Sequence, residues 1–267
     1  MRNFDLIIGG DTIRKSPKTS IKSPYDGAVV GKVVFGEKDD FDRALRSACE
    51  SFKIISTMPS HDRARMLRRI SVIIAERKQE LAEIIRDEAG KPITLALREV
   101  ERAVSTFALA ADEALRIDGS CLPLDNTAVG AGRTGLYRRF PLGPILGITP
   151  FNFPLNLVSH KVAPAIAAGN SIVIKPSSQT PMSSLVLQQI AANAGVPSGV
   201  FNVVPCPSSI AGKFVGDPRI KMVTFTGSAD VGWGIKQRAA KARVTLELGG
   251  NAATIVEPDC DIEDAAR

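Results

Sequence analysis

Four polar or glycine-containing runs in the second half of the sequence each follow a short apolar run of strand length. Their leading residues are Asn152, Lys175, Gly227 and Glu247. Taken singly, each has an ordinary structural explanation: a helix cap for Asn152, a solvated cation for Lys175, a turn for Gly227 and a salt-bridged carboxylate for Glu247. Together, their order and spacing predict a site that supplies an amide, an ammonium group and a carboxylate to a ligand.

Glycines accompany two of these residues. The two glycines directly after Glu247 permit a close approach of a ligand to the backbone. Gly227, Ser228 and Gly232 open a predicted helix, whose N-terminal amides and dipole favour a phosphate group. This spacing is not the G-x-G-x-x-G pattern, which argues against an ordinary Rossmann dehydrogenase.

The elements that must position these residues alternate regularly. From Gly143 onward, short apolar runs alternate with helical patterns, which predicts an α/β fold: a Rossmann-like, doubly wound parallel sheet with helices on both faces. Ligands bind at the carboxyl ends of the strands in such sheets. The predicted strands are Ile145 to Thr149, Ser171 to Ile174, Gly199 to Val204, Met222 to Phe225 and Val244 to Leu248.

The first half of the chain predicts a helical preface to this sheet. Helical patterns cover residues 39–56, residues 60–90 and Pro92 to Leu115. Proline before the second pattern and glycine at its end are typical helix boundaries. Between Gly119 and Arg139 the pattern changes to short extended segments, which predicts a β-hairpin arm.

Composition limits the class of protein. With 267 residues and 44% apolar content, the chain can bury a sizeable core. Since no apolar stretch is long enough to span a membrane and the N-terminus lacks the pattern of a signal peptide, we expect a soluble, cytoplasmic protein with no membrane partner. The four cysteines form no C-x-x-C pair and there are only two histidines, so neither a disulfide framework nor a metal site is predicted.

The net charge of +6 raises the question of an anionic partner. The densest basic run shares a helical stretch with an apolar stripe, so we interpret its arginines as a solvated face. Aromatic residues make up only 5% of the chain and do not alternate with basic residues, which argues against nucleic-acid binding. The arginines of this run are Arg63, Arg65, Arg68 and Arg69.

The string GITPFNFPLNLVSHKVAPAIAAGNSIVIKPSSQTP, followed by FTGSADVG and LELGGNA, resembles the NAD(P)-dependent aldehyde dehydrogenase superfamily. The resemblance extends from about Asp5 onward, and RRFPLGPILGITPFNFPLNL most resembles the branch that includes dehydrogenases of lactaldehyde and succinate semialdehyde. It implies an NAD(P)-binding domain from residues 1–118 and 141–248, an oligomerisation arm at residues 119–140, and the start of a catalytic domain at residues 249–267.

The resemblance also implies a mechanism, in which a cysteine thiolate attacks an aldehyde and passes through thiohemiacetal and thioester intermediates to a carboxylic acid. Asn152 matches the asparagine that stabilises the oxyanion, a role worth about 3 kcal/mol. Glu247 matches the general base. The asparagine and the glutamate argue against the alternative of an acyl-phosphate reductase with the same fold.

The implied cofactor is NAD or NADP. Lys175 matches a lysine that binds the adenosine ribose, and Ser178 stands where many NAD-specific members carry a glutamate. A hydroxyl can donate to a 2′-phosphate that a carboxylate would repel, so Ser178 permits NADP. The expected cofactor-binding residues are Ile148, Thr149, Pro150, Phe151, Asn152, Lys175, Pro176, Ser177, Ser178, Ser208, Gly212, Phe225, Thr226, Gly227, Ser228, Val231, Gly232, Glu247, Leu248 and Gly249.

The nucleophile of relatives follows the glutamate by a few tens of residues, and we expect it to lie outside this chain, which continues for only 20 residues beyond Glu247. The alternative to an enzyme is therefore an inactive nucleotide-binding fragment or an interaction module. A full-length relative would form a homodimer or homotetramer through the arm and act on a small aldehyde. In this chain we expect exposed apolar surface and a tendency to associate. The four cysteines, Cys49, Cys121, Cys206 and Cys260, are expected to be structural or incidental.

Overall fold

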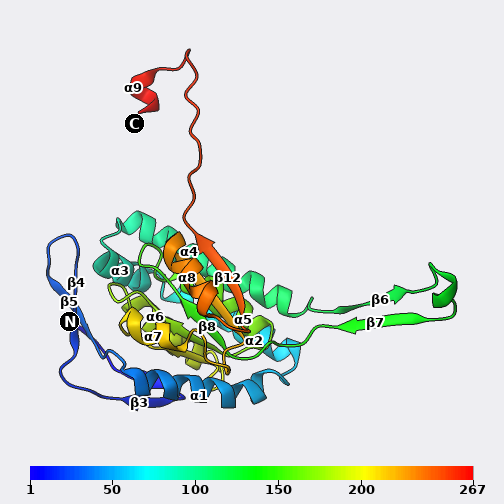
Figure 1. Ribbon diagram of the computed structural model, residues 1–267. Coiled ribbons are helices and arrows are strands. Elements are labelled where there is room, and N and C mark those ends of the chain that lie inside the picture. The colour runs from blue at the N-terminus through cyan, green and yellow to red at the C-terminus, as the bar shows by residue number, and fades with distance from the viewer. Residues whose placement is uncertain (267) are drawn as a thin grey trace.

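A computed structural model describes residues 1–266, and its centre is a parallel sheet of five strands (Figure 1). The strands lie in the order β10-β9-β8-β11-β12. The predicted parallel sheet is therefore confirmed, with differences only at the strand ends. The strand bounds are β8 (Ile145–Ile148), β9 (Ile172–Lys175), β10 (Phe201–Val203), β11 (Met222–Gly227) and β12 (Arg243–Leu248).

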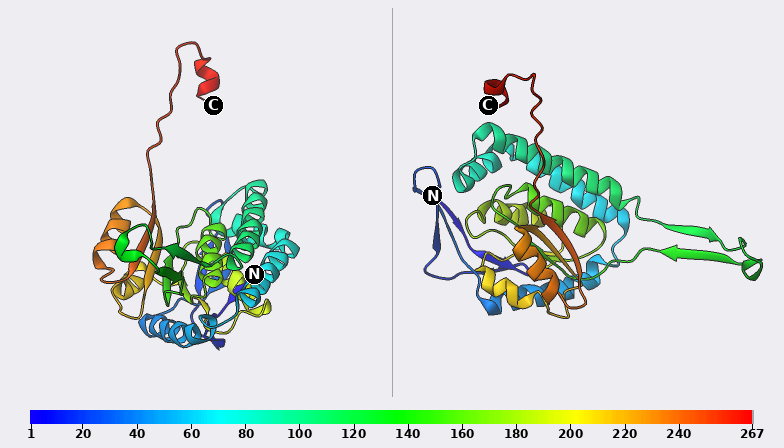
Figure 2. Two further views of the ribbon diagram at one scale, coloured as in Figure 1. Left: turned by 90° about the vertical axis from the view of Figure 1, so that its right-hand side faces the viewer. Right: turned by 45° about the horizontal axis from the view of Figure 1, so that its top comes forward.

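Helices cover both faces of this sheet, as Figure 2 shows. One face carries α5 (Asn156–Ala167) and α6 (Met182–Asn193), which contact β8, β9 and β10. The other carries α1 (Lys38–Ile55), α7 (Ser208–Phe214) and α8 (Ala229–Arg238). This two-sided cover is what the alternation of strand and helix patterns predicted.

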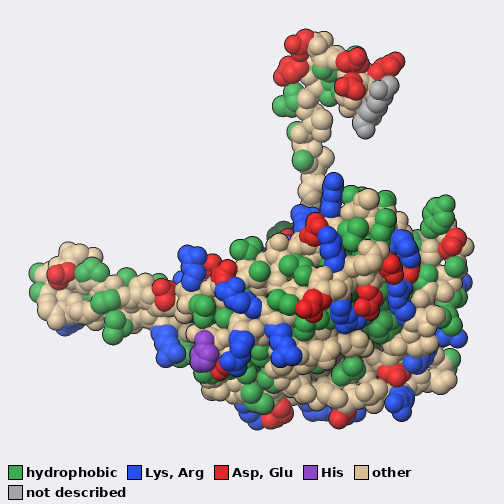
Figure 3. Space-filling view, turned by 180° about the vertical axis from the view of Figure 1, so that it is seen from behind, with side chains coloured by type: hydrophobic (Ala, Val, Ile, Leu, Met, Phe, Trp, Pro, Cys, Tyr) green, Lys and Arg blue, Asp and Glu red, His purple; other side chains and the backbone are tan. Residues whose placement is uncertain are grey.

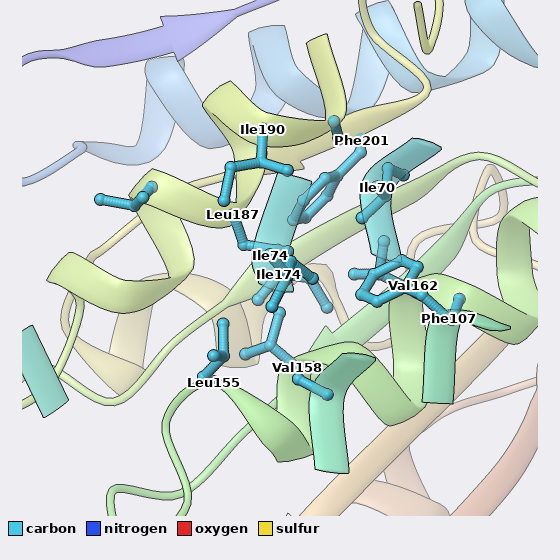
Figure 4. Packing of buried hydrophobic residues seen from close by; sticks show 14 of the residues in the cluster. Ile70, Ile74, Phe107, Leu155, Val158, Val162, Ile174, Leu187, Ile190 and Phe201 are labelled. Carbon is cyan, nitrogen blue, oxygen red and sulfur yellow. The ribbon is translucent and has the colours of Figure 1, made fainter. Parts of the chain in front are cut away.

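The sheet separates two apolar cores, because successive strand side chains point to opposite faces. In β9, Ile172 and Ile174 belong to the core beneath α5 and α6, whereas Val173 belongs to the core beneath α1 and α7. Figure 4 shows the first core, in which Ile174, Phe107 and Leu187 lie among side chains from several helices.

Three helices of the first half form an outer layer on α5 and α6: α2 (Ser60–Glu76), α3 (Lys78–Ala89) and α4 (Ile93–Ala114). The prediction of one helix over residues 60–90 was wrong, because the chain breaks at Arg77. No glycine or proline marks this break. It lets α2 pack on α5 while α3 turns toward α6, so tertiary contacts decide it.

Strands precede the helices, which the expected helical preface omitted. The N-terminal strands form a three-stranded sheet, β1-β5-β4, and a hairpin, β2-β3. Leu6 and Ile8 are buried while Ile7 is half-buried, the alternation of a strand with one face on the core. The bounds are β1 (Arg2–Phe4), β2 (Leu6–Ile8), β3 (Asp11–Ile13), β4 (Thr19–Lys22) and β5 (Val29–Val33).

Two segments project from the body (Figure 1). The first is an antiparallel hairpin of β6 (Gly119–Pro123) and β7 (Thr134–Arg138), joined through the short helix η1 (Ala128–Gly130). The second follows β12 and ends in α9 (Ile262–Ala265). Both carry exposed apolar side chains, with Leu136 and Ile255 each 81% exposed.

Basic and acidic side chains alternate over the face shown in Figure 3. Arg65, Arg68 and Arg69 are exposed, as expected. The expectation of a solvated side chain was wrong for Arg63. Its guanidinium is half-buried and donates a hydrogen bond of 3.0 Å to the carbonyl oxygen of Ala167. Burial lowers the pKa of Arg63. Within residues 1–266, no helix has the length and apolar character needed to cross a membrane.

Candidate functional site

The candidate site lies where the strand order of the main sheet reverses. The chain passes from β8 outward to β9 and β10, then returns to the other side of β8 as β11 and β12. In doubly wound sheets this reversal opens a crevice at the carboxyl ends of the strands. Ile148 lies opposite Lys175 on one side and Phe225 on the other, and Thr226 lies opposite Glu247.

Lys175 is a buried cation at this edge. The residue is 5% exposed, and its Nζ donates 3.3 Å to Ser208 Oγ at the start of α7. Burial lowers the pKa of Lys175, opposed by the charge of Cys206. No carboxylate of residues 1–266 forms an ion pair with it. A buried ammonium group without an anion fits a ligand that supplies phosphate or hydroxyl oxygens.

Ser178 lies beyond Lys175 on the same connection. It is exposed, and its Oγ donates 3.4 Å to the carbonyl oxygen of Cys206. The connections after β9 and β10 are therefore linked through two serines, Ser178 and Ser208. Both hydroxyls make only long hydrogen bonds, which they can give up to bind a ligand.

The amino end of α8 faces the same edge. Its N-cap residue, Ser228, makes no side-chain capping bond, so the first amides of the helix remain for an anion. A Cβ at Gly227 would come within 2.5 Å of the Phe225 ring, and one at Gly232 within 2.4 Å of Leu248. The glycines thus let the chain fold closely over Phe225. This helix end and Lys175 together fit the anionic middle and the ribose of a dinucleotide.

Phe225 itself takes a supporting position. The residue is only 5% exposed and belongs to the core beneath α1 and α7, where its ring packs under both glycines. Val231, in contrast, is 51% exposed on the first turn of α8. Of these two expected cofactor residues, Val231 is therefore the one with a free surface.

Glu247 lines a pocket of about 330 Å³ between α5 and the last strands. Lys161 and His160 of α5 line it too, with Thr224 and Thr226 of β11. The Lys161 ammonium donates 3.0 Å to Thr224 Oγ1 and 2.9 Å to Thr226 Oγ1. The pocket thus places an exposed carboxylate near a buried cation held by two hydroxyls.

The sequence interpretation did not single out Lys161 or His160. Burial lowers the pKa of Lys161 to about 8, opposed by the charge of Glu247. Burial also lowers the pKa of His160, while Glu247 raises it. The available signal was a lysine within the apolar pattern of a helix that begins four residues after Asn152. A lysine buried in this way must have polar partners.

Asn152 lies on the connection between β8 and α5, and it is exposed. The next residue, Phe153, packs beneath the Lys91 ammonium, 3.8 Å from the ring centroid, and contacts Arg102. Phe153 and His160 line a second groove along α4. Because His160 lines both this groove and the pocket of Glu247, the two lie on adjacent sides of α5.

The remaining expected site residues follow the same strand ends. Thr149 and Pro176 are buried, whereas Phe151 is 56% exposed. Gly212 lies inside α7, one helical turn after Ser208. Leu248 is half-buried at the end of β12, and Pro150, Ser177 and Gly249 are half-buried or exposed on the connections after β8, β9 and β12.

The four cysteines lie away from the pocket of Glu247. Cys49 is half-buried in α1, and Cys121 and Cys260 are exposed on the hairpin and the C-terminal segment. Cys206 is buried, and burial raises the pKa of its thiol to about 11. A thiol with a raised pKa holds little thiolate near neutral pH, so it is a poor nucleophile.

Comparison with known proteins agrees with this geometry. The model of the aldehyde dehydrogenase family matches residues 13–267. A 3-sulfolactaldehyde dehydrogenase of Priestia megaterium is 36% identical over 100% of this chain and 56% of its own length. The crystal structure of aldehyde dehydrogenase 21 from Physcomitrella patens, in complex with the reaction product succinate, superposes with a TM-score of 0.90 at 38% identity. This match covers 94% of the present chain and 53% of the chain of the Physcomitrella patens enzyme.

A second solved structure, the NADP-dependent glyceraldehyde-3-phosphate dehydrogenase of Bacillus halodurans complexed with NADP, superposes with a TM-score of 0.89 at 35% identity. This match also covers 94% of the present chain and 53% of the chain of the Bacillus halodurans enzyme. The chain belongs to the aldehyde dehydrogenase family and has its fold. It spans about half the length of the relatives it matches.

Proposed function

We propose that this chain is the cofactor-binding part of an enzyme that oxidises an aldehyde to a carboxylic acid with NAD or NADP. The observation that carries the proposal is the convergence at one sheet edge of three groups: the buried cation Lys175, the uncapped amino end of α8 and the carboxylate Glu247. The first two suit a dinucleotide, and the third suits proton transfer beside it.

The cofactor would span the strand reversal. Lys175 and Ser208 would hold the adenosine ribose, and the first amides of α8 would hold the pyrophosphate, with Val231 beside the adenine. Ser178 offers a hydroxyl rather than a carboxylate to a 2′-phosphate, which supports NADP as well as NAD. A structural relative complexed with NADP, the dehydrogenase of Bacillus halodurans, supports this reading.

Asn152 and Glu247 would divide the chemistry between them. The Asn152 amide would donate to the oxyanion that forms when the carbonyl is attacked, and Glu247 would take a proton from the attacking group. The chemistry that NAD(P) would supply when bound is acceptance of the hydride from the aldehyde carbon, and a water oxygen would complete the acid. Lys161, with its lowered pKa, would receive a proton from or return one to Glu247.

The cysteine nucleophile of this mechanism, with its thiohemiacetal and thioester intermediates, would not be one of the four cysteines described above. Since none of them lines the pocket of Glu247 within residues 1–266, we propose that other polypeptide supplies it. The same observation favours a second candidate function, in which these 267 residues alone bind the nucleotide without turnover.

The domain organisation is part of the proposal. We assign residues 1–118 and 141–248 to the cofactor-binding domain and residues 249–267 to the start of a catalytic domain. The hairpin at residues 119–140 would pair with a second subunit, and its exposed Leu136 and Val129 support this role. The substrate would be a small aldehyde, in keeping with the related 3-sulfolactaldehyde dehydrogenase of Priestia megaterium.

Calorimetric titration with NADP and with NAD tests the proposal, on the wild type and on Ser178→Glu. We expect NADP to bind, and the glutamate to weaken NADP at least tenfold more than NAD, because a carboxylate repels the 2′-phosphate. Gln179→Glu, one residue further along the exposed connection, is the control for added charge. Folded protein that binds neither nucleotide would refute the cofactor site.

A further inference from the structure

The connection that carries Asn152 is held by side chains from another part of the chain. Between β8 and α5 it contains no regular secondary structure apart from turns and bends. Two side chains that contact it, those of Lys91 and Glu99, lie just before and within α4. These residues are separated from Asn152 by more than 50 positions in the sequence.

Glu99 caps α5 from outside the helix. Its side chain is 0% exposed, and Oε1 accepts hydrogen bonds from the backbone amides of Leu155 at 3.0 Å and Asn156 at 3.1 Å. The N-cap residue of α5, Leu155, makes no side-chain capping bond of its own. The carboxylate therefore satisfies amides that a helix start otherwise leaves unpaired, and its charge suits the positive end of the helix dipole.

Lys91 joins this cap to Asn152. Its Nζ forms an ion pair with Glu99 Oε2 and donates 2.7 Å to the backbone carbonyl oxygen of Asn152. The same ammonium lies over the Phe153 ring. Only 13% of the Lys91 side chain and none of the Glu99 side chain is exposed, so this ion pair is largely shielded from solvent. Opposite charges attract each other more strongly in such surroundings than at an exposed surface.

The pair therefore fixes the backbone both at Asn152 and three residues later. An oxyanion donor contributes only when its direction is set before the reaction, within roughly 0.5 Å and 10–20°. We propose that Lys91 and Glu99 are positioning residues that set the direction of the Asn152 side-chain amide. The significance for catalysis rests on the proposed function, but the positioning itself can be measured without turnover.

The test uses the side-chain amide resonances of Asn152 in the 267-residue chain labelled with ¹⁵N-asparagine, assigned by their loss in Asn152→Ala. We expect Glu99→Gln and Lys91→Met to move these resonances and to speed hydrogen exchange at the Leu155 and Asn156 amides by about tenfold. Lys91→Arg, which can donate to the same two oxygens, should restore wild-type spectra.

Two controls separate positioning from general loss of stability. Glu88→Gln alters another buried carboxylate, which caps α6 through the amides of Met182 and Ser183. Lys78→Met removes the exposed ion pair of α3 with Glu101 of α4. Neither should move the Asn152 resonances. Resonances that stay in place in Glu99→Gln and Lys91→Met, or that move equally in Glu88→Gln, would overturn the inference.

The same samples keep this result apart from the proposed function. Titration of each variant with NADP reports on the cofactor site, because Lys91 and Glu99 do not contact Lys175 or α8 among the described residues. A wild type that binds no nucleotide but shows the expected shifts would refute the cofactor and leave the positioning role standing. Normal nucleotide binding without the resonance shifts would support the cofactor site and refute the positioning role.

Discussion

Lys175, at the end of β9, and Ser208, the first residue of α7, meet through a hydrogen bond of 3.3 Å. The serine hydroxyl is the partner that the structure gives this buried ammonium. A neutral partner leaves the charge of Lys175 uncompensated, so the free protein bears a desolvation cost that an anionic or hydroxyl-rich ligand would relieve. Binding and stability at this residue are therefore expected to oppose each other.

Lys175→Met should show this opposition directly. We expect both NADP and NAD to bind roughly 10- to 100-fold more weakly, because a charge-assisted hydrogen bond worth about 1.5–3 kcal/mol is lost. The melting temperature of the ligand-free protein should stay the same or rise, since burial lowers the pKa of Lys175 and so disfavours its charged form. Calorimetry and thermal denaturation measure the two effects. Unchanged affinity would separate Lys175 from the cofactor.

Glu88 should make stability depend on pH. Burial raises its pKa from 4.5 to about 7, opposed by hydrogen bonds from Ser183 and Met182. An acid whose folded pKa is raised stabilises the fold below its unfolded pKa, and this stability is lost as pH rises through the folded pKa.

We therefore expect the free energy of unfolding to fall by about 2 to 3 kcal/mol from pH of about 4.5 to about 7 through this group. Urea denaturation of wild type and Glu88→Gln at both values gives the difference. A pH slope of the same size in Glu88→Gln would show that another group is responsible.

Lys161 should make the free energy of unfolding rise with pH in the alkaline range. Its pKa falls from 10.5 to about 8 because of burial. Between these values the unfolded chain holds a proton that the folded chain releases, so stability rises with pH. From about pH 8 to about pH 10 we expect a gain of about 2 kcal/mol that Lys161→Met lacks. Lys236→Met, on the exposed face of α8, serves as the matched control and should keep the gain.

Phe107 tests the first core independently of any ligand. Its ring is fully buried where α4 packs on α2 and α5 (Figure 4). Phe107→Ala should lower the free energy of unfolding by about 3–5 kcal/mol, through lost burial and the cavity left behind. Leu109→Ala, two residues along the same helix but 65% exposed, should change it by less than about 0.5 kcal/mol. Similar losses in both variants would contradict this packing.

The sheet was predictable because its signals are local. Apolar runs of strand length at β8, β9 and β11 alternate with helical patterns, and the right-handed crossover then leaves few topologies. Leu6 and Ile8 carry an equally local signal for the N-terminal strand β2. The break at Arg77 had no such signal, because it depends on which helices α2 and α3 meet in the folded protein.

In the candidate site, too, some residues could be predicted from local sequence signals and others could not. Lys175, Gly227 and Glu247 could be placed at one sheet edge from the sequence, because each ends a strand. The contacts that hold the connection at Asn152 could not be predicted, because Lys91 and Glu99 precede Asn152 by 61 and 53 positions. In the sequence they look like ordinary charged residues before and within a helix. Only the docking of α4 on α5 brings their charged groups to that connection.

The glutamates that cap α5 and α6 also have a consequence for folding. Glu99 lies 56 residues from the nearer amide that it caps, and Glu88 lies 94 residues from its own. The side-chain acceptor for the first amides of each helix is not local in sequence, and it reaches them only when α3 and α4 dock. We therefore expect the start of α5 to become ordered late in folding, and the segment that bears Asn152 to acquire its shape together with the outer helical layer rather than with the sheet.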